Sequence, residues 1–389
     1  MLAGRDGILA DITGAWEAGS THPGCTTLLL GRRGSGKTVI LEALRKRAHA
    51  RGWLTVPEAA VSPGLLNRLG HKALVLLNDQ AHELSIDLTR TLRAAGIGLG
   101  SDYEPDADLS RRVGNVLSAL AAHLQPSGAS LVITVDELHA GDTDELRMLG
   151  IVVQDITRIA RLPMAFVGAG LPVLENTLLA DTHVTFLQRC TRHEVGFLDH
   201  AAAWSALSEP IRERGGRLAP NAAEHGVAVS QGYPFMVQLI GFHAWEAAPD
   251  PTSAVDLNDM RAGAEEARRQ VGQLVIAPMW RDLSEGSQRF LAAMALDDGP
   301  SRPTDLTARL GVSSGYVSVY QSRLRTAGMI APAGNRRLDF AIGAARQWIR
   351  GLDEYPLLCE TLKLTDRPPA RRTQAFLVVP QPQPEARKS

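Results

Sequence analysis

The feature that most constrains this chain is a glycine-rich segment that directly follows a short apolar run. Residues Gly31 to Thr38 read Gly-Arg-Arg-Gly-Ser-Gly-Lys-Thr, with Leu28 to Leu30 before them and the helical pattern Val39 to Arg47 after them. A buried strand, such a loop and a helix in this order make the phosphate-binding P-loop in its usual context. Backbone N–H groups of the loop and of the helix N-terminus converge and can hold a polyphosphate. The sequence therefore predicts a nucleotide site.

The residues of this segment have separate predicted roles. Gly34 and Gly36 let the backbone approach the anion because they carry no Cβ atom. Lys37 is expected to reach the β- and γ-phosphates of ATP, and the Thr38 hydroxyl is expected to hold Mg²⁺. The predicted nucleotide contacts here are Gly31, Gly34, Ser35, Gly36, Lys37, Thr38 and Val39.

A second apolar run, Leu131 to Val135, ends in two carboxylates. Asp136 at the end of this predicted strand is expected to hold the Mg²⁺ shell, and Glu137 to orient and polarise the attacking water. Alone, a strand that ends in Asp-Glu is a weak signal, but a P-loop earlier in the chain makes it a strong one. His139 is expected to be a surface or supporting residue.

Composition excludes several classes of protein. A chain of 389 residues predicts two or three domains, and a net charge of −1 argues against a generally basic nucleic-acid coat. The cysteines Cys25, Cys190 and Cys359 lack metal-ligand spacing, which favours free thiols in a reducing compartment. No apolar stretch is long enough to span a membrane, and the N-terminus is not a signal peptide. We expect a cytoplasmic protein that does not bind membranes.

The pattern along the chain predicts an α/β domain over residues 1–196 and a helical domain over 197–282. Short apolar runs that alternate with helical patterns require a parallel sheet flanked by helices. A Gly/Asp/Pro-rich loop is expected at Gly96 to Asp108, and a disordered, proline-rich tail at 365–389. The predicted strands are Thr26–Leu30, Leu54–Pro57, Leu131–Val135 and Met164–Val167.

Residues 283–352 predict a small domain at the C-terminal side. A helix that ends near Asp297 is followed by helices Pro303 to Leu310 and Ser314 to Ala327, and then by two strands joined at Gly334-Asn335. Helix, turn, helix and β-hairpin wing make a winged helix-turn-helix. Nine arginines against five acids in residues 284–350 give this segment a charge of +4.

The charge of this segment predicts contact with double-stranded DNA, with protein contact as the open alternative. Winged helices also serve as packing modules, and a charge of +4 is modest. A DNA reader should place Arg323, Arg325, Arg336 and Arg337 on one exposed face, whereas a protein scaffold would bury or ion-pair them. The predicted nucleic-acid residues are Ser314, Tyr316, Gln321, Arg325, Arg336 and Arg337.

Two further positions bear on catalysis. The predicted strand Met164–Val167 is followed by Gly168-Ala169-Gly170, where ATPases of this architecture usually carry a polar residue that senses the γ-phosphate, so fast hydrolysis is doubtful. Arg189 is a candidate finger for the γ-phosphate of a neighbouring subunit in a homo-oligomer, with an ordinary surface arginine as the equal alternative. Arg192 is expected to be an ordinary surface or ion-paired arginine.

Over residues 1–350 the order of these motifs resembles the AAA+ superfamily, in particular its origin-recognition and helicase-loader branch. The Gly31–Thr38 and Asp136-Glu137 segments match its Walker A and Walker B motifs. Gly4-Arg5-Asp6 resembles the opening motif of that branch, which implies that Gly4 and Arg5 lie near the adenine. Gly232 to Phe235, followed by Gln238, resembles the start of the lid helix, which implies that Tyr233 and Pro234 cover the nucleotide.

The resemblance has two departures, the missing polar sensor and Tyr233-Pro234 in place of the arginine that replication initiators carry. This lid is closer to nucleotide switches of the STAND type, and bacterial transposition ATPases share a similar core. The sequence predicts an ATP- and Mg²⁺-dependent ATPase that acts as a nucleotide-controlled switch and binds DNA through its winged helix. The alternatives are a signalling scaffold whose winged helix contacts proteins and, less favoured, a small-molecule transferase.

Overall fold

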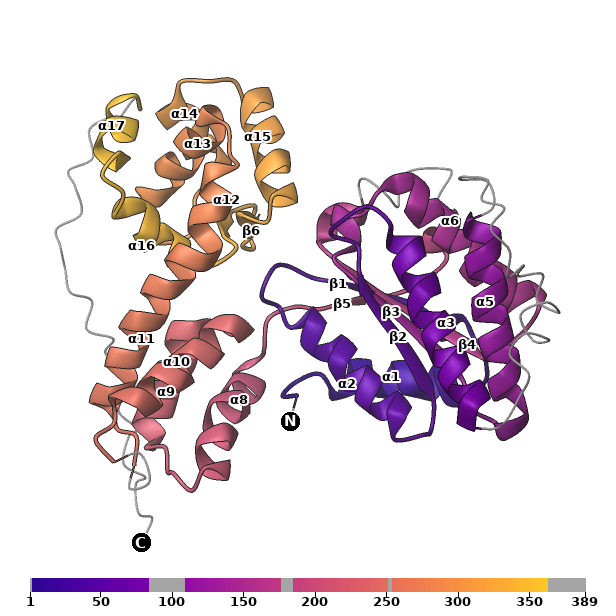
Figure 1. Ribbon diagram of the computed structural model, residues 1–389. Coiled ribbons are helices and arrows are strands. Elements are labelled where there is room, and N and C mark those ends of the chain that lie inside the picture. The colour runs from indigo at the N-terminus through magenta and orange to yellow at the C-terminus, as the bar shows by residue number, and fades with distance from the viewer. Residues whose placement is uncertain (1, 84–108, 176–184, 251–253, 363–389) are drawn as a thin grey trace, which may run out of the picture.

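Residues 2–196, here called the sheet domain, form a five-stranded parallel sheet with helices on both faces (Figure 1). The computed structural model describes residues 2–83, 109–175, 185–250 and 254–362, so the predicted loop at 96–108 and tail at 365–389 lie outside the described residues. The strand order is β2-β3-β4-β1-β5. The strands are β1 (Thr26–Leu30), β2 (Leu54–Ala59), β3 (Leu131–Asp136), β4 (Met164–Gly170) and β5 (Thr191–Glu194).

Side chains that alternate along the central strands fill two separate apolar cores. Leu28 and Leu30 of β1 point to one face of the sheet and Leu29 points to the other. Because helices cover both faces, the central strands read as continuous apolar runs. One face is covered by α1 (Asp6–Glu17) and α2 (Lys37–His49), and the other by α3 (Leu65–Glu83), α5 (Leu109–Leu124) and α6 (Thr143–Gln154).

The predicted fold class is confirmed, and the strand predictions differ mainly at their ends. β1 has its predicted bounds, whereas β2, β3 and β4 run two, one and three residues further. The sequence analysis missed β5, whose residues Thr191 to Glu194 are polar and alternate between half-buried and exposed. β5 pairs only with β1 at the edge of the sheet, so it lacks the apolar run that reveals a central strand.

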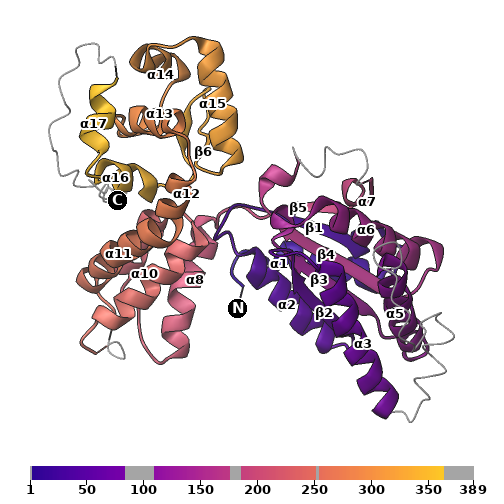
Figure 2. The same cartoon turned by 45° about the horizontal axis from the view of Figure 1, so that its top comes forward.

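Residues 197–282, here called the helical region, contain four main helices: α8 (His200–Glu213), α9 (Pro220–Ser230), α10 (Pro234–Ala247) and α11 (Leu257–Val271). The π-helical segment η6 (Gly272–Ile276) and the short helix α12 (Ala277–Arg281) continue directly from α11 and lead into the next region (Figure 2). Among the aromatic residues of this region, Tyr233 is buried in the core. Trp204, Phe235 and Trp245 are partly buried and pack against it.

Residues 283–362, here called the C-terminal region, contain three helices followed by a short antiparallel ladder of β6 (Ile330–Pro332) and β7 (Leu338–Phe340). The helices are α13 (Glu285–Ala295), α14 (Pro303–Leu310) and α15 (Ser314–Thr326), each within a few residues of its prediction. Ser301 adds a single bridge to Leu338 beside the ladder. Two further helices, α16 (Ala344–Arg350) and α17 (Tyr355–Glu360), were not predicted.

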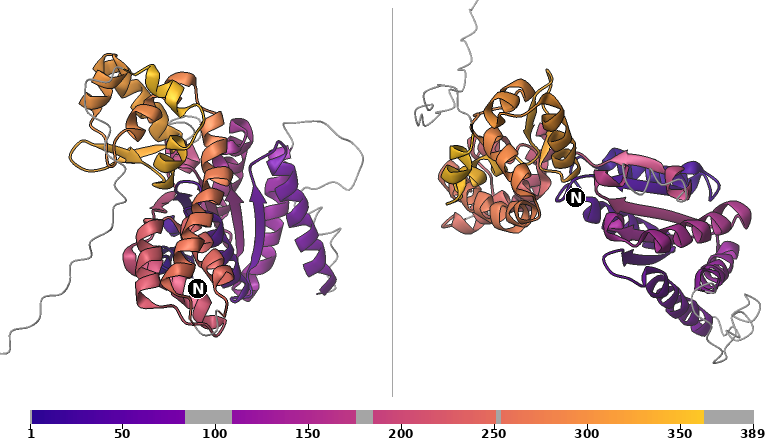
Figure 3. Two further views of the ribbon diagram at one scale, coloured as in Figure 1. Left: turned by 90° about the vertical axis from the view of Figure 1, so that its left-hand side faces the viewer. Right: turned by 90° about the horizontal axis from the view of Figure 1, so that it is seen from above.

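The helical and C-terminal regions share one continuous apolar core, which is separate from the two cores of the sheet domain. It runs from Tyr233 and Met260 in the helical region to Phe290 and Leu324 in the C-terminal region. Trp280 and Trp348 meet edge to face across the junction, with ring centroids 5.9 Å apart. The chain therefore forms two bodies, as Figure 3 shows, and passes from one to the other around Gly196.

Within the part of the chain that the structure describes, no helix is long and apolar enough to cross a membrane.

The shared core predicts a test of this division. Phe290→Ala removes a fully buried ring of the C-terminal region and should cost about 3–5 kcal/mol of unfolding free energy. Hydrogen exchange should then rise in α10 and α11 as well as in α13. The matched variant Phe166→Ala, in the sheet domain, should raise exchange in the sheet instead. If hydrogen exchange in Phe290→Ala rises only within residues 283–362, the two regions do not share a common core.

Candidate nucleotide-binding site

The P-loop connects the carboxyl end of β1 to the N-terminus of α2. Gly34 and Gly36 have φ angles of 70° and 94°, a left-handed region that favours glycine. Gly34 also lies against Tyr233. A Cβ atom at this position would fall 2.3 Å from the tyrosine hydroxyl oxygen. The loop conformation thus requires glycine both for its backbone angles and for space.

Lys37 is buried at the start of α2, and its ammonium group lies against the loop itself. Lys37 Nζ donates to the carbonyl oxygens of Gly31 at 2.8 Å and Arg32 at 3.0 Å. Burial lowers the pKa of Lys37, while the nearby charges of Glu137 and Asp136 raise it. A polyphosphate in the loop would offer stronger, charged acceptors than these two carbonyls.

Thr38 and Asp136 meet where the P-loop and β3 end side by side. The Thr38 hydroxyl donates to Asp136 Oδ2 at 2.6 Å. A hydroxyl and a carboxylate are the hard oxygen ligands that Mg²⁺ prefers, so this pair fits the predicted magnesium site. These two residues would hold the ion, which supplies charge neutralisation for the phosphates.

Glu137 follows Asp136 in a left-handed backbone conformation, with a φ angle of 54°. Its Oε2 atom lies 3.2 Å from Nε2 of the half-buried His139. Burial lowers the pKa of His139 and the charge of Glu137 raises it. His139 therefore holds the predicted catalytic carboxylate, a contact that the sequence analysis left open because a loop histidine carries no spacing signal.

The carboxyl end of β4 has no side chain to offer a nucleotide. A Cβ atom at Gly168 would fall 2.5 Å from Leu138 Cδ1, and one at Gly170 would fall 2.2 Å from Leu174 Cδ1. Ala169 between them is fully buried. A polar sensor at either glycine would therefore have to displace the end of a leucine side chain.

Gly4 and Arg5 join the P-loop to the segment that links the two bodies. Gly4 lies against Ala202 of α8, and the buried Arg5 directly precedes α1. Arg5 Nη2 donates to the carbonyl oxygens of Ser35 at 3.0 Å and Gly196 at 2.6 Å. Arg5 therefore couples the loop to the linker by hydrogen bonds; its predicted proximity to the adenine stays a prediction.

Tyr233 and Pro234 bring the helical region onto the P-loop. Tyr233 precedes α10, whose first residue is Pro234, and its ring lies 5.2 Å from that of Phe197. Burial raises the pKa of the Tyr233 hydroxyl to about 12. Among the residues that the structure describes, neither this hydroxyl nor the buried Ser35 hydroxyl has a hydrogen-bond partner. Both are polar atoms beside the loop that a bound ligand could satisfy.

Of the remaining nucleotide contacts expected, Val39 is exposed on the first turn of α2. Arg189 is exposed in the short link between α7 (Thr185–Gln188) and β5, at the edge of the sheet. Arg192 lies 3.9 Å from Glu175 and donates to the Gln188 carbonyl, in line with an ordinary ion-paired arginine.

The predicted DNA residues do not share one face. Tyr316 stacks on Tyr320 with ring centroids 4.4 Å apart, whereas Gln321 and Arg325 line a cavity beside the P-loop. Arg336 is exposed in the turn between β6 and β7, and Arg337 donates to the Pro300 carbonyl at 3.4 Å. Ser314 is exposed at the start of α15.

Part of the positive charge counted in this region is neutralised within it. Three arginines form ion pairs with acids of the same region: Arg309 with Asp297, Arg346 with Asp339 and Arg350 with Asp298. The charge available to a nucleic acid is therefore carried by fewer arginines than the sequence contains.

Sheet order, P-loop and paired carboxylates together define a P-loop ATPase fold. Residues 1–167 match the family model of an AAA ATPase domain, and residues 273–349 match a domain of unknown function, DUF8462. The N-terminal part of the chain is thus similar to AAA ATPase domains. The second match begins in η6, so it includes the end of the long helix that joins the helical and C-terminal regions. No curated protein sequence matches the chain.

Comparisons with solved structures give matches at low sequence identity. A Walker-type ATPase of Pyrococcus abyssi is 14% identical with a TM-score of 0.64, over 89% of this chain and 95% of that one. Cdc6p of Pyrobaculum aerophilum is 14% identical with a TM-score of 0.46, over 93% and 96%. The RuvB branch migration motor of Thermotoga maritima is 17% identical with a TM-score of 0.44, over 86% and 92%.

The geometry predicts a large effect for Lys37→Ala. The variant loses the charge-assisted hydrogen bonds to phosphate, each worth about 1.5–3 kcal/mol, so ATP affinity should fall about 100-fold or more. Isothermal titration calorimetry with ATP and Mg²⁺ measures this. Lys46→Ala on the exposed side of the same helix is the control and should bind normally. Unchanged affinity in Lys37→Ala would rule out the P-loop assignment.

Proposed function

We propose that this protein binds and hydrolyses ATP with Mg²⁺ and uses the nucleotide as a conformational switch. The observation that carries the proposal is a hydrogen bond from the P-loop to the C-terminal region. Arg32 Nη1 donates to the carbonyl oxygen of Ala341 at 3.1 Å, and its guanidinium lies 5.7 Å from the Phe197 ring. A loop that binds phosphate and also contacts the other body can transmit its occupancy to that body.

Hydrolysis would use Glu137 as the group that takes a proton from the attacking water, with Lys37 against the phosphates. The ion held by Thr38 and Asp136 would neutralise phosphate charge. We expect slow turnover because β4 offers no polar side chain at Gly168 or Gly170. Before hydrolysis, the Glu137 carboxylate must break its contact with His139 and form one with the attacking water.

The two bodies can turn relative to one another because each has its own apolar core. Their contacts around the nucleotide site are Tyr233 on Gly34, Arg5 on the Gly196 linker, and Arg32 on Ala341. Phosphate in the loop would change the first and third of these contacts directly. The angle between the bodies would then depend on the nucleotide.

The C-terminal region is proposed to bind duplex DNA. This rests on its two consecutive helices followed by a β-ladder, and on the exposed Arg336 in the turn of that ladder. A homo-oligomer in which Arg189 reaches a neighbouring active site is part of the same proposal.

A signalling scaffold is the second candidate, and one observation favours it. Arg323 lies over the Tyr320 ring at 5.4 Å, whereas Arg325 lines the interdomain cavity, so these two arginines do not form one DNA face. The exposed surface of α15 also carries the apolar side chain of Val319. A surface of this kind suits a protein partner as well as DNA.

Glu137→Gln tests hydrolysis. The amide keeps the shape of the side chain but cannot accept the proton, so turnover should fall about 100-fold or more while ATP binding persists. Phosphate release and nucleotide titration measure the two quantities separately. Glu265→Gln, an exposed carboxylate on α11, serves as control. Equal turnover in Glu137→Gln would remove this residue from catalysis.

Duplex-DNA binding, titrated with salt and with or without ATP and Mg²⁺, separates the two candidates. A DNA-acting switch should bind with an affinity that falls steeply between about 50 and 200 mM salt and that changes with the nucleotide. Arg336→Ala should weaken this binding. Absence of DNA binding in every nucleotide state would favour the scaffold.

A further inference from the structure

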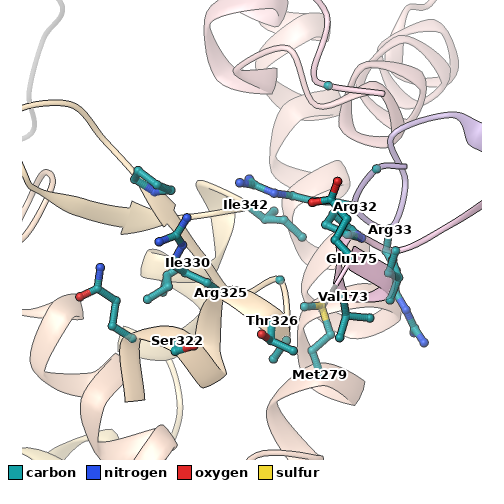
Figure 4. Close-up of a pocket in the computed structure, with 18 of the residues that line it drawn as sticks. Arg32, Arg33, Val173, Glu175, Met279, Ser322, Arg325, Thr326, Ile330 and Ile342 are labelled. Carbon is teal, nitrogen blue, oxygen red and sulfur yellow. The ribbon is translucent and has the colours of Figure 1, made fainter. Parts of the chain in front are cut away.

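A cavity of about 1130 Å³ separates the P-loop from α15 (Figure 4). Its walls come from both bodies. Gly31, Arg32 and Arg33 of the P-loop line one side, and Arg325 and Thr326 of α15 line the other. The cavity therefore joins the phosphate-binding loop to a helix that lies almost three hundred residues later in the chain.

Arg325 is the arginine of α15 that faces this cavity. It lies on the same side of the helix as Ser318, Gln321 and Ser322, which also line the cavity. Arg323 is two residues away and points to the other side, over the Tyr320 ring. Figure 4 shows Arg325 and Arg32 reaching in from opposite walls.

Arg325 also differs from its neighbours in having no partner. Arg309, Arg346 and Arg350 pair with acids, and Arg32 donates to Ala341, but among the described residues none forms a hydrogen bond or ion pair with the Arg325 side chain. Of the acids that line the cavity, Glu194 interacts with Arg32 and Glu175 lies near Arg192, while Asp282 lies on the side of the helical region. The Arg325 guanidinium thus lines the cavity, exposed to solvent and without a protein partner among the described residues.

Neither the end of β4 nor the start of the lid helix brings a positive side chain to the nucleotide site. The end of β4 consists of Gly168, Ala169 and Gly170, and the lid helix begins with Tyr233 and Pro234. In the P-loop, Lys37 is buried, Arg32 is engaged with the other body, and the exposed Arg33 lines the same cavity. An arginine across the cavity is well suited to this role because its fork of N–H donors matches phosphate oxygens.

We propose that Arg325 senses the terminal phosphate of ATP. The assignment rests on the proposed function, because it requires ATP in the P-loop. When ATP binds, the two bodies close across the cavity and the Arg325 guanidinium donates to the terminal phosphate. ADP lacks that phosphate and leaves the cavity open. Arg325 then determines the preference for ATP over ADP and sets the position of the C-terminal region, and it is not a DNA-reading residue.

The test compares Arg325→Gln with the matched variant Arg323→Gln on the same helix. Affinities for the non-hydrolysable analogue AMP-PNP and for ADP are measured by calorimetry with Mg²⁺. Arg325→Gln should bind AMP-PNP about 10-fold more weakly or worse, with ADP affinity unchanged. Arg323→Gln should bind both nucleotides as the unaltered protein does. Arg325→Lys keeps the charge and should recover part of the loss.

The remaining outcomes are distinct. If Arg325→Gln keeps the preference of the unaltered protein for AMP-PNP over ADP, the assignment is overturned; if it also loses duplex-DNA binding, Arg325 reads DNA as the sequence analysis expected. If the unaltered protein binds neither nucleotide, the proposed function is wrong, and the role assigned to Arg325 is wrong as well. Because Arg325 is exposed, the substitution should leave the melting temperature unchanged.

Discussion

The apolar core shared by the helical and C-terminal regions is the constraint on which the rest of the molecule depends. Trp280 and Trp348 fix the end of the long α11–η6–α12 helix to α16, so the two regions behave as one body. That body has little apolar contact with the sheet domain. Any motion that nucleotide binding causes must then occur between the two bodies, at the polar contacts around the P-loop.

The P-loop is where those polar contacts gather. Arg5 ties Ser35 to the linker at Gly196, Tyr233 packs on Gly34, and Arg32 reaches Ala341. These contacts are few compared with the apolar packing inside each body. Few contacts between the bodies, together with extensive packing within each body, allow the two bodies to adopt two alternative arrangements.

The sequence predicted the sheet domain well because its signals are local. Apolar runs marked the central strands, and the spacing of glycines, Lys37, Thr38 and two carboxylates marked the site. It could not predict β5, whose polar edge strand has no apolar run, or the pairing of His139 with Glu137. The helical period places Arg323 and Arg325 on opposite sides of α15, but the sequence could not show which of the two sides faces the sheet domain.

The close packing at the end of β4 limits how this enzyme could be altered. A faster ATPase would seem one substitution away, with asparagine at residue 168 or 170. A side chain at 168 would meet Leu138 and Leu28, and one at 170 would meet Leu174. A polar side chain at either position would therefore require these leucine side chains to move, so the packing of the core and the chemistry at the end of β4 are coupled.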